Sequence, residues 1–223
     1  MLIGKKVFYT VSASTEYPTP FKGGFAMNNR WTPAVTIESH NGTREIQLYS
    51  ELLSNRNIFL QGEITEETAN EFLTQFLYLT SQSSEEIKLY INSPGGNITA
   101  GLVIYDLIQS SPAPIKFYCT GMAASMAAII LAGGQKGNRY ILPHSKVMIH
   151  EPLIAGGVGG SATSIKNIAD SILQTRKLVN EILSKHTGKT VEEIEESTSF
   201  DNYLNAEEAV KFGLCDQIIP GFI

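Results

Sequence analysis

The fold class of this chain is clearest in residues 87–131, IKLYINSPGGNITAGLVIYDLIQSSPAPIKFYCTGMAASMAAIIL. This stretch opens with β-branched and apolar residues at 87–91, passes the loop signal NSPGG, and then shows helical apolar spacing over 100–110. The same order repeats, because a strand pattern at 115–119 precedes a helix of small residues at 123–131. This alternation predicts an α/β fold with mostly parallel strands and right-handed crossovers.

The alternation extends outward on both sides of this stretch. Residues 66–80 predict an amphipathic helix that Thr65 caps, with Glu66 and Glu67 at its positive end. Its apolar face is expected to consist of Ala69, Phe72, Leu73, Phe76 and Leu77. Further strands are expected at 57–61, 146–150 and 216–219, and further helices at 161–186, closed by Gly188, and at 205–212.

The composition describes a globular protein rather than a disordered, collagenous or coiled-coil one, with 43% apolar and 17% charged residues among 223. The net charge is 17 − 22 = −5, which offers no broad basic surface to nucleic acid or anionic lipid. No apolar run reaches the roughly 18 residues of a membrane span. Cys119 and Cys215 do not make a disulfide framework or a four-ligand zinc site, so the expected compartment is the reducing cytoplasm.

The first 32 residues differ from the rest of the chain. Residues 1–32 are basic and contain no unbroken apolar stretch of the kind that a secretory signal needs. They are expected to be a poorly ordered extension or a removable propeptide, and residues 33–223 to form a single domain.

Phosphate and metal motifs are missing from the sequence. It contains no GxxxxGK[ST], no Rossmann GxGxxG after a strand and no HExxH, so bound ATP and a zinc site are disfavoured. The glycine-rich segment 154–160 has no Lys-Ser/Thr after it, and it is expected to be either a flexible β segment or an ordinary loop.

Three polar residues lie at positions where α/β proteins commonly place active-site side chains. Ser125 lies where a strand gives way to a helix, and His150 ends a buried-looking strand. Asp201 lies in a polar loop before a helix. The other histidines are expected to be exposed, His40 and His186 beside turns and His144 in a loop. Taken singly, each residue also has a structural interpretation, as a packing serine, a core histidine or a capping aspartate.

Taken together, these residues supply the groups that acyl-transfer catalysis requires. A serine is a weak nucleophile unless a histidine takes its proton, and a carboxylate must hold that histidine in one tautomer. Gly95-Gly96 could bring backbone N–H groups to a developing oxyanion. The spacing in the sequence does not show whether these groups meet.

Several motifs resemble the proteolytic subunit of the Clp protease, ClpP. They are YINSPGGNITAG (90–101), GMAASMAA (121–128), LPHSKVMIHEP (142–152), KHTGKTVEEIE (185–195) and FDNYLNAEEAVKFGLCD (200–216). The resemblance covers about residues 33–219. It implies that Ser125 is the nucleophile, His150 the general base and Asp201 the triad acid. It also implies that Gly96 and Met126 donate the two oxyanion N–H groups.

The resemblance also implies an architecture. It predicts a crotonase-like ββα spiral with a protruding handle over about 154–187, made of a glycine-rich strand and a long helix. It implies two stacked heptameric rings, a tetradecamer, whose chamber holds the active sites and whose pores are flanked by loops at about 36–47. Unfolded proteins would be fed in by a hexameric Clp ATPase of the ClpX, ClpA or ClpC type, which binds the ATP. The ATPase docking surface would comprise Lys88, Tyr90, Tyr118, Thr120, Tyr140 and Leu142.

Some positions depart from the family pattern. Lys88 and Thr120 are polar where the docking pockets are usually apolar, and Met122 stands where glutamine is usual. These departures suggest a divergent paralogue. The alternatives to a serine endopeptidase are therefore a catalytically silent or regulatory subunit of a mixed ring and, more remotely, a crotonase-type acyl-CoA enzyme.

Overall fold

The computed structural model describes residues 7–8, 34–39, 42–154 and 156–221. The chain divides into two compact units, Met1–Arg56 and Asn57–Ile223. Of the expected extension at 1–32, only Val7–Phe8 belongs to the described residues, and the expected disorder of the rest lies outside them.

The first unit contains a small antiparallel sheet with the strand order β1-β2-β3. Its elements are β1 (Val7–Phe8), β2 (Ala34–Ser39), β3 (Gly42–Gln47) and α1 (Leu48–Ser54). The region expected to form a pore loop, 36–47, therefore lies largely in β2 and β3, and His40 lies outside the described residues.

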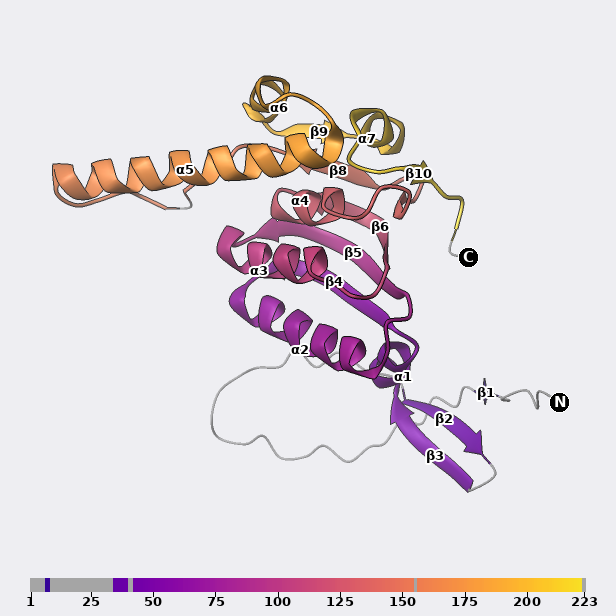
Figure 1. Ribbon diagram of the computed structural model, residues 1–223. Coiled ribbons are helices and arrows are strands. Elements are labelled where there is room, and N and C mark those ends of the chain that lie inside the picture. The colour runs from indigo at the N-terminus through magenta and orange to yellow at the C-terminus, as the bar shows by residue number, and fades with distance from the viewer. Residues whose placement is uncertain (1–6, 9–33, 40–41, 155, 222–223) are drawn as a thin grey trace. The chain divides into compact units, whose positions relative to one another are not determined.

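The second unit is built on a mostly parallel sheet, which confirms the predicted α/β class (Figure 1). Its strands are β4 (Asn57–Ile64), β5 (Ile87–Gly96), β6 (Ile115–Ala124), β7 (Arg139–Ile141), β8 (Lys146–Ile149), β9 (Asn202–Leu204) and β10 (Gln217–Ile218). The strand order is β10-β7-β6-β5-β4, and β8 pairs with the last residues of β6. The antiparallel partner of β8 is β9.

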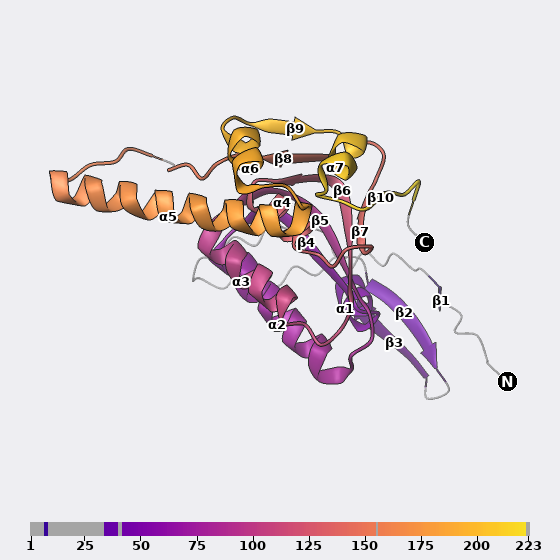
Figure 2. The ribbon, with the colours of Figure 1, turned by 45° about the horizontal axis from the view of Figure 1, so that its top comes forward.

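Helices cover one face of this sheet, and α2 and α3 lie side by side on it (Figure 2). The helices are α2 (Glu66–Gln82), α3 (Ile98–Gln109), α4 (Met126–Ala132), α5 (Ala162–Thr187), α6 (Val191–Thr198) and α7 (Ala206–Phe212). Alternate residues of β5, namely Ile87, Leu89 and Ile91, are at most 1% exposed, whereas Lys88 and Tyr90 between them are half-buried. This period of two is typical of a strand whose two faces differ in burial.

Helix α2 begins as the sequence predicts. Thr65 is its N-cap and accepts a hydrogen bond from the Thr68 N–H at 3.2 Å. The buried residues are Ala69, Phe72, Phe76 and Leu79. The expectation for Leu77 was wrong, because this side chain is 55% exposed and Leu79 continues the buried stripe instead. In a helix with 3.6 residues per turn, the buried face that contains Phe72 and Phe76 also contains Leu79, and Leu77 lies outside it.

Two strands run further than their local sequence signals indicate. The expected loop Asn92–Gly96 lies inside β5, and β6 continues through Ala124, so that α4 begins only at Met126. Glu63 pairs with Gly95 and Ser93 pairs with Ala123, so the ladder holds residues that would favour a turn in isolation. Tertiary pairing here overrides local propensity.

The second half of the chain contains the predicted long helix. Ser161 caps α5 and Gly188 ends it in the left-handed conformation at φ 81°. The N-terminal part of α5 extends away from the sheet of its unit (Figure 1). Within this single chain the described residues of the glycine-rich segment form no strand, in accordance with the loop alternative. A strand needs a neighbour to take its backbone hydrogen bonds.

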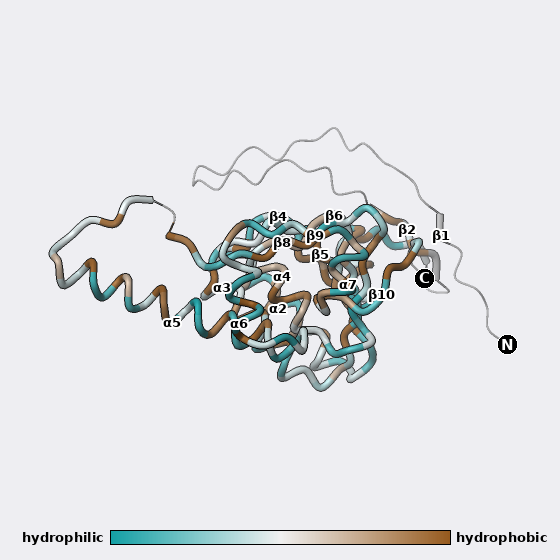
Figure 3. Tube along the Cα trace, turned by 90° about the horizontal axis from the view of Figure 1, so that it is seen from above, coloured by the Kyte–Doolittle hydropathy of each residue, from teal (hydrophilic) through white to brown (hydrophobic). Residues whose placement is uncertain are grey.

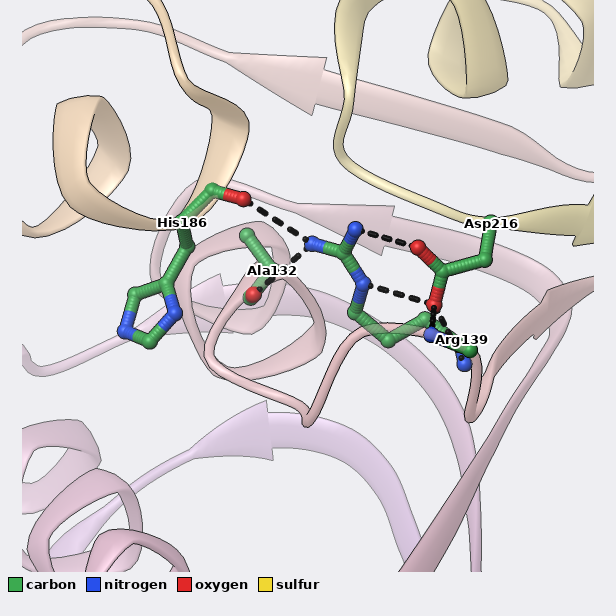
Figure 4. A network of polar contacts seen from close by, with 5 residues as sticks. Ala132, Arg139, His186 and Asp216 are labelled. Carbon is green, nitrogen blue, oxygen red and sulfur yellow. Dashed lines mark hydrogen bonds and ion pairs between the residues drawn. The ribbon is translucent and has the colours of Figure 1, made fainter.

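A buried ion pair joins β7 to the segment just before β10 (Figure 4). Arg139 is 2% exposed, and its guanidinium donates to both carboxylate oxygens of Asp216 and to the carbonyls of Ala132 and His186. Burial by itself raises the pKa of Asp216, but the hydrogen bonds and charge of Arg139 outweigh it and lower that pKa.

His186 is half-buried beside this pair, which contradicts its expected exposure. Its Nε2 lies 2.8 Å from the Tyr105 hydroxyl. Desolvation, with smaller contributions from Lys185, Arg139 and Lys136, lowers the pKa of His186 to about 4. The imidazole is therefore neutral at pH 7.

Candidate active site

Ser125 occupies a tight turn between β6 and α4. Its backbone has φ 54° and ψ −124°, a conformation that costs free energy for a residue with a Cβ. The Ser125 N–H donates to the Met148 carbonyl at 2.8 Å, and every residue of α4 is buried. The packed helix therefore holds this strained turn in place and presents the hydroxyl at the end of the strand.

His150 follows β8 directly and lies next to Ser125. Its Nε2 is 2.9 Å from the Ser125 Oγ. Since β8 pairs in parallel with the last residues of β6, with Met148 opposite Ala124, the ends of the two strands meet at this point. Ladder register, and not sequence proximity, thus brings the hydroxyl to the imidazole.

Asp201 reaches the other nitrogen of the same imidazole. It directly precedes β9, whose Asn202 pairs with Ile149 across the antiparallel ladder, and its Oδ1 lies 3.0 Å from the His150 Nδ1. An ionised carboxylate only accepts hydrogen bonds, so the Nδ1 carries the proton and the Nε2 is free to accept one from Ser125. The structure therefore brings together all three residues that the sequence singled out.

The glycine pair at the end of β5 lies against this turn. A Cβ on Gly95 would come within 2.7 Å of the Ser125 Cβ and 3.0 Å of the Met126 N. A Cβ on Gly96, at φ 151°, would come within 2.3 Å of the Ile64 carbonyl oxygen. Only glycine allows the backbone to approach so closely. Gly96 and Met126, the two expected oxyanion donors, line the same cavity as Ser125.

A cavity of about 770 Å³ opens beside these groups, and both Ser125 and His150 line it. Most of the remaining lining residues are apolar, including Leu102, Ile129 and Ile172. Glu63 also lines the cavity, and sequence reasoning did not single it out, because only the pairing of β4 with β5 brings it there. Such a cavity suits an apolar side chain next to a reacting carbonyl.

The cysteines are not alternative nucleophiles. The pKa of the Cys119 thiol is raised to about 12, mainly because the thiol is buried. Burial likewise raises the pKa of the Cys215 thiol. The thiolate is the reactive form, so both groups are unreactive at neutral pH. Among the described residues, no group of three or more His, Cys, Asp and Glu side chains could hold a metal ion. None of the described helices is both long and apolar enough to cross a bilayer.

The residues of the expected docking surface lie in register across the sheet. Phe59, Tyr90, Tyr118 and Tyr140 pair in order and form a ladder of stacked rings, with centroids 5.1 to 5.3 Å apart. Lys88 precedes Tyr90 by two residues and so shares its face. Thr120 follows Tyr118 by two residues and donates its hydroxyl to the Ile91 carbonyl at 3.3 Å. Leu142 stands two residues beyond Tyr140, just past the end of β7.

Fold and site together define an α/β protein with a Ser-His-Asp arrangement at the ends of its strands. The sequence model of the family described as Clp protease matches residues 40–221 of this chain. The chain belongs to the Clp protease family.

Proposed function

We propose that this chain is a serine endopeptidase and the proteolytic subunit of an ATP-dependent chambered protease. The observation that carries the proposal is the continuous contact from the Ser125 Oγ through the His150 imidazole to the Asp201 carboxylate, at 2.9 and 3.0 Å. Membership of the Clp protease family supports a peptidase function for this arrangement. An acyl-CoA enzyme of the crotonase type needs no such set.

The proposed reaction begins when the Ser125 Oγ attacks a peptide carbonyl carbon and the His150 Nε2 takes the hydroxyl proton. The carbonyl oxygen becomes an oxyanion and accepts hydrogen bonds from the N–H groups of Gly96 and Met126. His150 then gives its proton to the leaving amine, and the C–N bond breaks to leave an acyl-enzyme. Water, activated by His150, attacks the ester and releases the new carboxylate.

The aliphatic cavity supports a preference for apolar side chains at the residue that donates the scissile carbonyl. Although Asn97, Thr99, Ser171 and Thr175 also line the cavity, its apolar part around Leu102, Ile129 and Ile172 offers no hydrogen-bonding group to a polar side chain. Desolvating an unpaired polar side chain there would cost free energy that an apolar one does not lose.

Exposed aliphatic residues support association of several copies, as the two heptameric rings of the proposal require. On α5, Ile165, Ile168 and Leu173 are between 38 and 56% exposed, and Leu153 is 64% exposed. Figure 3 shows hydrophobic residues recurring along α5 between hydrophilic ones. Apolar patches of this kind mark contact surfaces. A partner Clp ATPase would dock on the aromatic ladder and would bind the ATP, so this chain needs no cofactor.

The test combines a covalent probe with a substitution. Intact mass spectrometry after treatment with a fluorophosphonate should show one adduct, which peptide mapping places on Ser125. Ser125→Ala should remove the adduct and lower peptide hydrolysis by orders of magnitude, while the size of the assembly measured by sedimentation stays the same. If Ser125 remains unlabelled both alone and with a partner ClpP subunit or a Clp ATPase, the chain is a silent ring subunit instead.

A further inference from the structure

Glu63 is a carboxylate on the wall of an otherwise largely apolar substrate cavity. Among the described residues that line this cavity, the only other ionisable side chain is His150. Glu63 is exposed, and none of the ion pairs formed by described residues includes it. Its charge therefore faces the cavity without a counterion from the described part of the chain.

The register of the sheet places Glu63 close to the reacting groups. Glu63 pairs with Gly95 in the parallel β4–β5 ladder, where neighbouring strands lie about 4.8 Å apart. The backbone of Gly95 in turn lies against Ser125, since a Cβ at Gly95 would be 2.7 Å from the Ser125 Cβ. Glu63 is thus separated from the nucleophile by the single strand β5, and both residues line the same cavity.

The backbone around Glu63 is anchored, although its carboxylate forms no ion pair with another described residue. The Glu63 carbonyl accepts a hydrogen bond from the Thr68 hydroxyl at 3.0 Å, and the Ile64 carbonyl accepts one from the Asn97 N–H at 2.8 Å. Gly62, at φ 75°, lies where the β4–β5 register shifts. Strand irregularities of this kind change the direction of side chains and are common next to active sites.

We infer that Glu63 is a specificity-determining residue whose carboxylate binds a lysine or arginine side chain of the substrate, within about three residues of the scissile bond. This inference rests on the proposed peptidase function and names a substrate feature for the same site. The apolar part of the cavity would hold one side chain, and Glu63 would form an ion pair with a cationic neighbour. A substrate that covers this wall excludes water from the pair, which strengthens it relative to an open surface.

The experiment uses the assembled full-length protein and fluorogenic peptides that share one leucine before the scissile bond. In each peptide a single other position, from three residues before to three residues after the bond, carries either lysine or the uncharged norleucine. The measured quantity is the ratio of kcat/KM for the lysine peptide to that for its norleucine partner. At low salt this ratio should reach about two- to fivefold at one or two positions and fall at high salt.

Glu63→Gln should bring that ratio to about one, and Glu63→Lys should favour peptides that carry glutamate at the same positions. The matched control is Glu66→Gln, which removes the same charge three residues away from an exposed site that does not line the cavity, and it should keep the wild-type ratio. The inference is overturned if Glu63→Gln keeps the ratio, or if Glu66→Gln lowers it equally, because a long-range potential would then be responsible.

A binding measurement separates this inference from the proposed function. Fluorescence anisotropy with the Ser125→Ala protein compares the affinity for the lysine and norleucine peptides without any turnover. If the chain with Ser125 intact hydrolyses neither peptide, while Glu63→Gln abolishes the affinity ratio in the Ser125→Ala protein, the peptidase function is overturned and the cationic preference stands. Turnover of both peptides with no Glu63 dependence in either ratio would overturn the preference alone.

Discussion

His150 and Ser125 are 25 residues apart in the chain, and yet the His150 Nε2 lies 2.9 Å from the Ser125 Oγ. The parallel ladder between β6 and β8 creates this contact, and the antiparallel ladder between β8 and β9 adds Asp201 on the far side of the imidazole. Each of the three residues stands at or just outside the end of a strand. The geometry of the site therefore depends on strand register, and variants that alter a single contact test it.

Asp201→Asn should lower kcat by several orders of magnitude. An asparagine amide can donate to the Nδ1, which favours the tautomer whose Nε2 carries the proton and cannot accept one from Ser125. Steady-state peptide hydrolysis measures the effect. Asp106→Asn, at an exposed position of α3, is the control and should hydrolyse peptide at the wild-type rate. Near wild-type turnover by Asp201→Asn would remove Asp201 from the triad.

Gly96→Ala should reduce peptidase activity by about a hundredfold or more, the typical effect of losing one oxyanion donor. The added Cβ would lie 2.3 Å from the Ile64 carbonyl oxygen, so the backbone must shift and carry its N–H away from the site. Gly221→Ala is the control, because a Cβ there meets no atom within 4 Å. Wild-type kcat in a folded Gly96→Ala protein would show that the Gly96 N–H does not stabilise the transition state.

Asp216→Asn should lower the free energy of unfolding by about 3 kcal/mol or more, because it leaves the buried Arg139 guanidinium without its counterion. Urea denaturation at pH 7 measures this change. The exposed Asp106 offers a control, and Asp106→Asn should change the free energy of unfolding by less than about 0.5 kcal/mol. A loss below about 1 kcal/mol in Asp216→Asn would mean that water or the neighbouring carbonyls satisfy Arg139 without the carboxylate.

His186 should make the protein less stable as the pH falls from about 6.5 to about 4. The pKa of His186 is about 4 in the folded chain, whereas an unperturbed histidine has a pKa of about 6.5, so the unfolded chain binds more protons in this window. His186→Gln should flatten the dependence of the unfolding free energy on pH there. His144→Gln replaces an exposed histidine and should leave the slope as it is. An unchanged slope in His186→Gln would contradict the buried, neutral assignment.

Lys88→Tyr should tighten binding of an ATP-bound ClpX hexamer several-fold. The substitution replaces an ammonium group with an aromatic ring on the face of the Phe59–Tyr140 ladder, where an apolar anchor loses less on desolvation. Surface plasmon resonance measures the Kd. Lys136→Tyr is the control, since Lys136 lies outside the ladder and lines a different cavity. Unchanged or weaker affinity of Lys88→Tyr would undermine the assignment of this surface.

Local patterns in the sequence indicated the fold class and several helix ends, and they singled out the three residues that lie together at the candidate site. Apolar periodicity located α2, and Thr65 and Gly188 marked helix ends, because capping and amphipathic spacing act within a few residues. The same signals failed where distant segments compete with local preference. Asn92–Gly96 belong to strand β5, although a loop was expected there. His186 is half-buried against Tyr105, although exposure was expected.

Local sequence patterns identify the available chemical groups: a serine at a strand-to-helix turn, a histidine at a strand end, a carboxylate in a polar loop and a glycine pair. Whether these groups meet depends on the tertiary structure. Contacts between residues 25 and 51 positions apart depend on strand order and register, which local periodicity does not encode. The same applies to Glu63, whose place on the cavity wall follows from its pairing with Gly95 and from nothing in its own neighbourhood of the sequence.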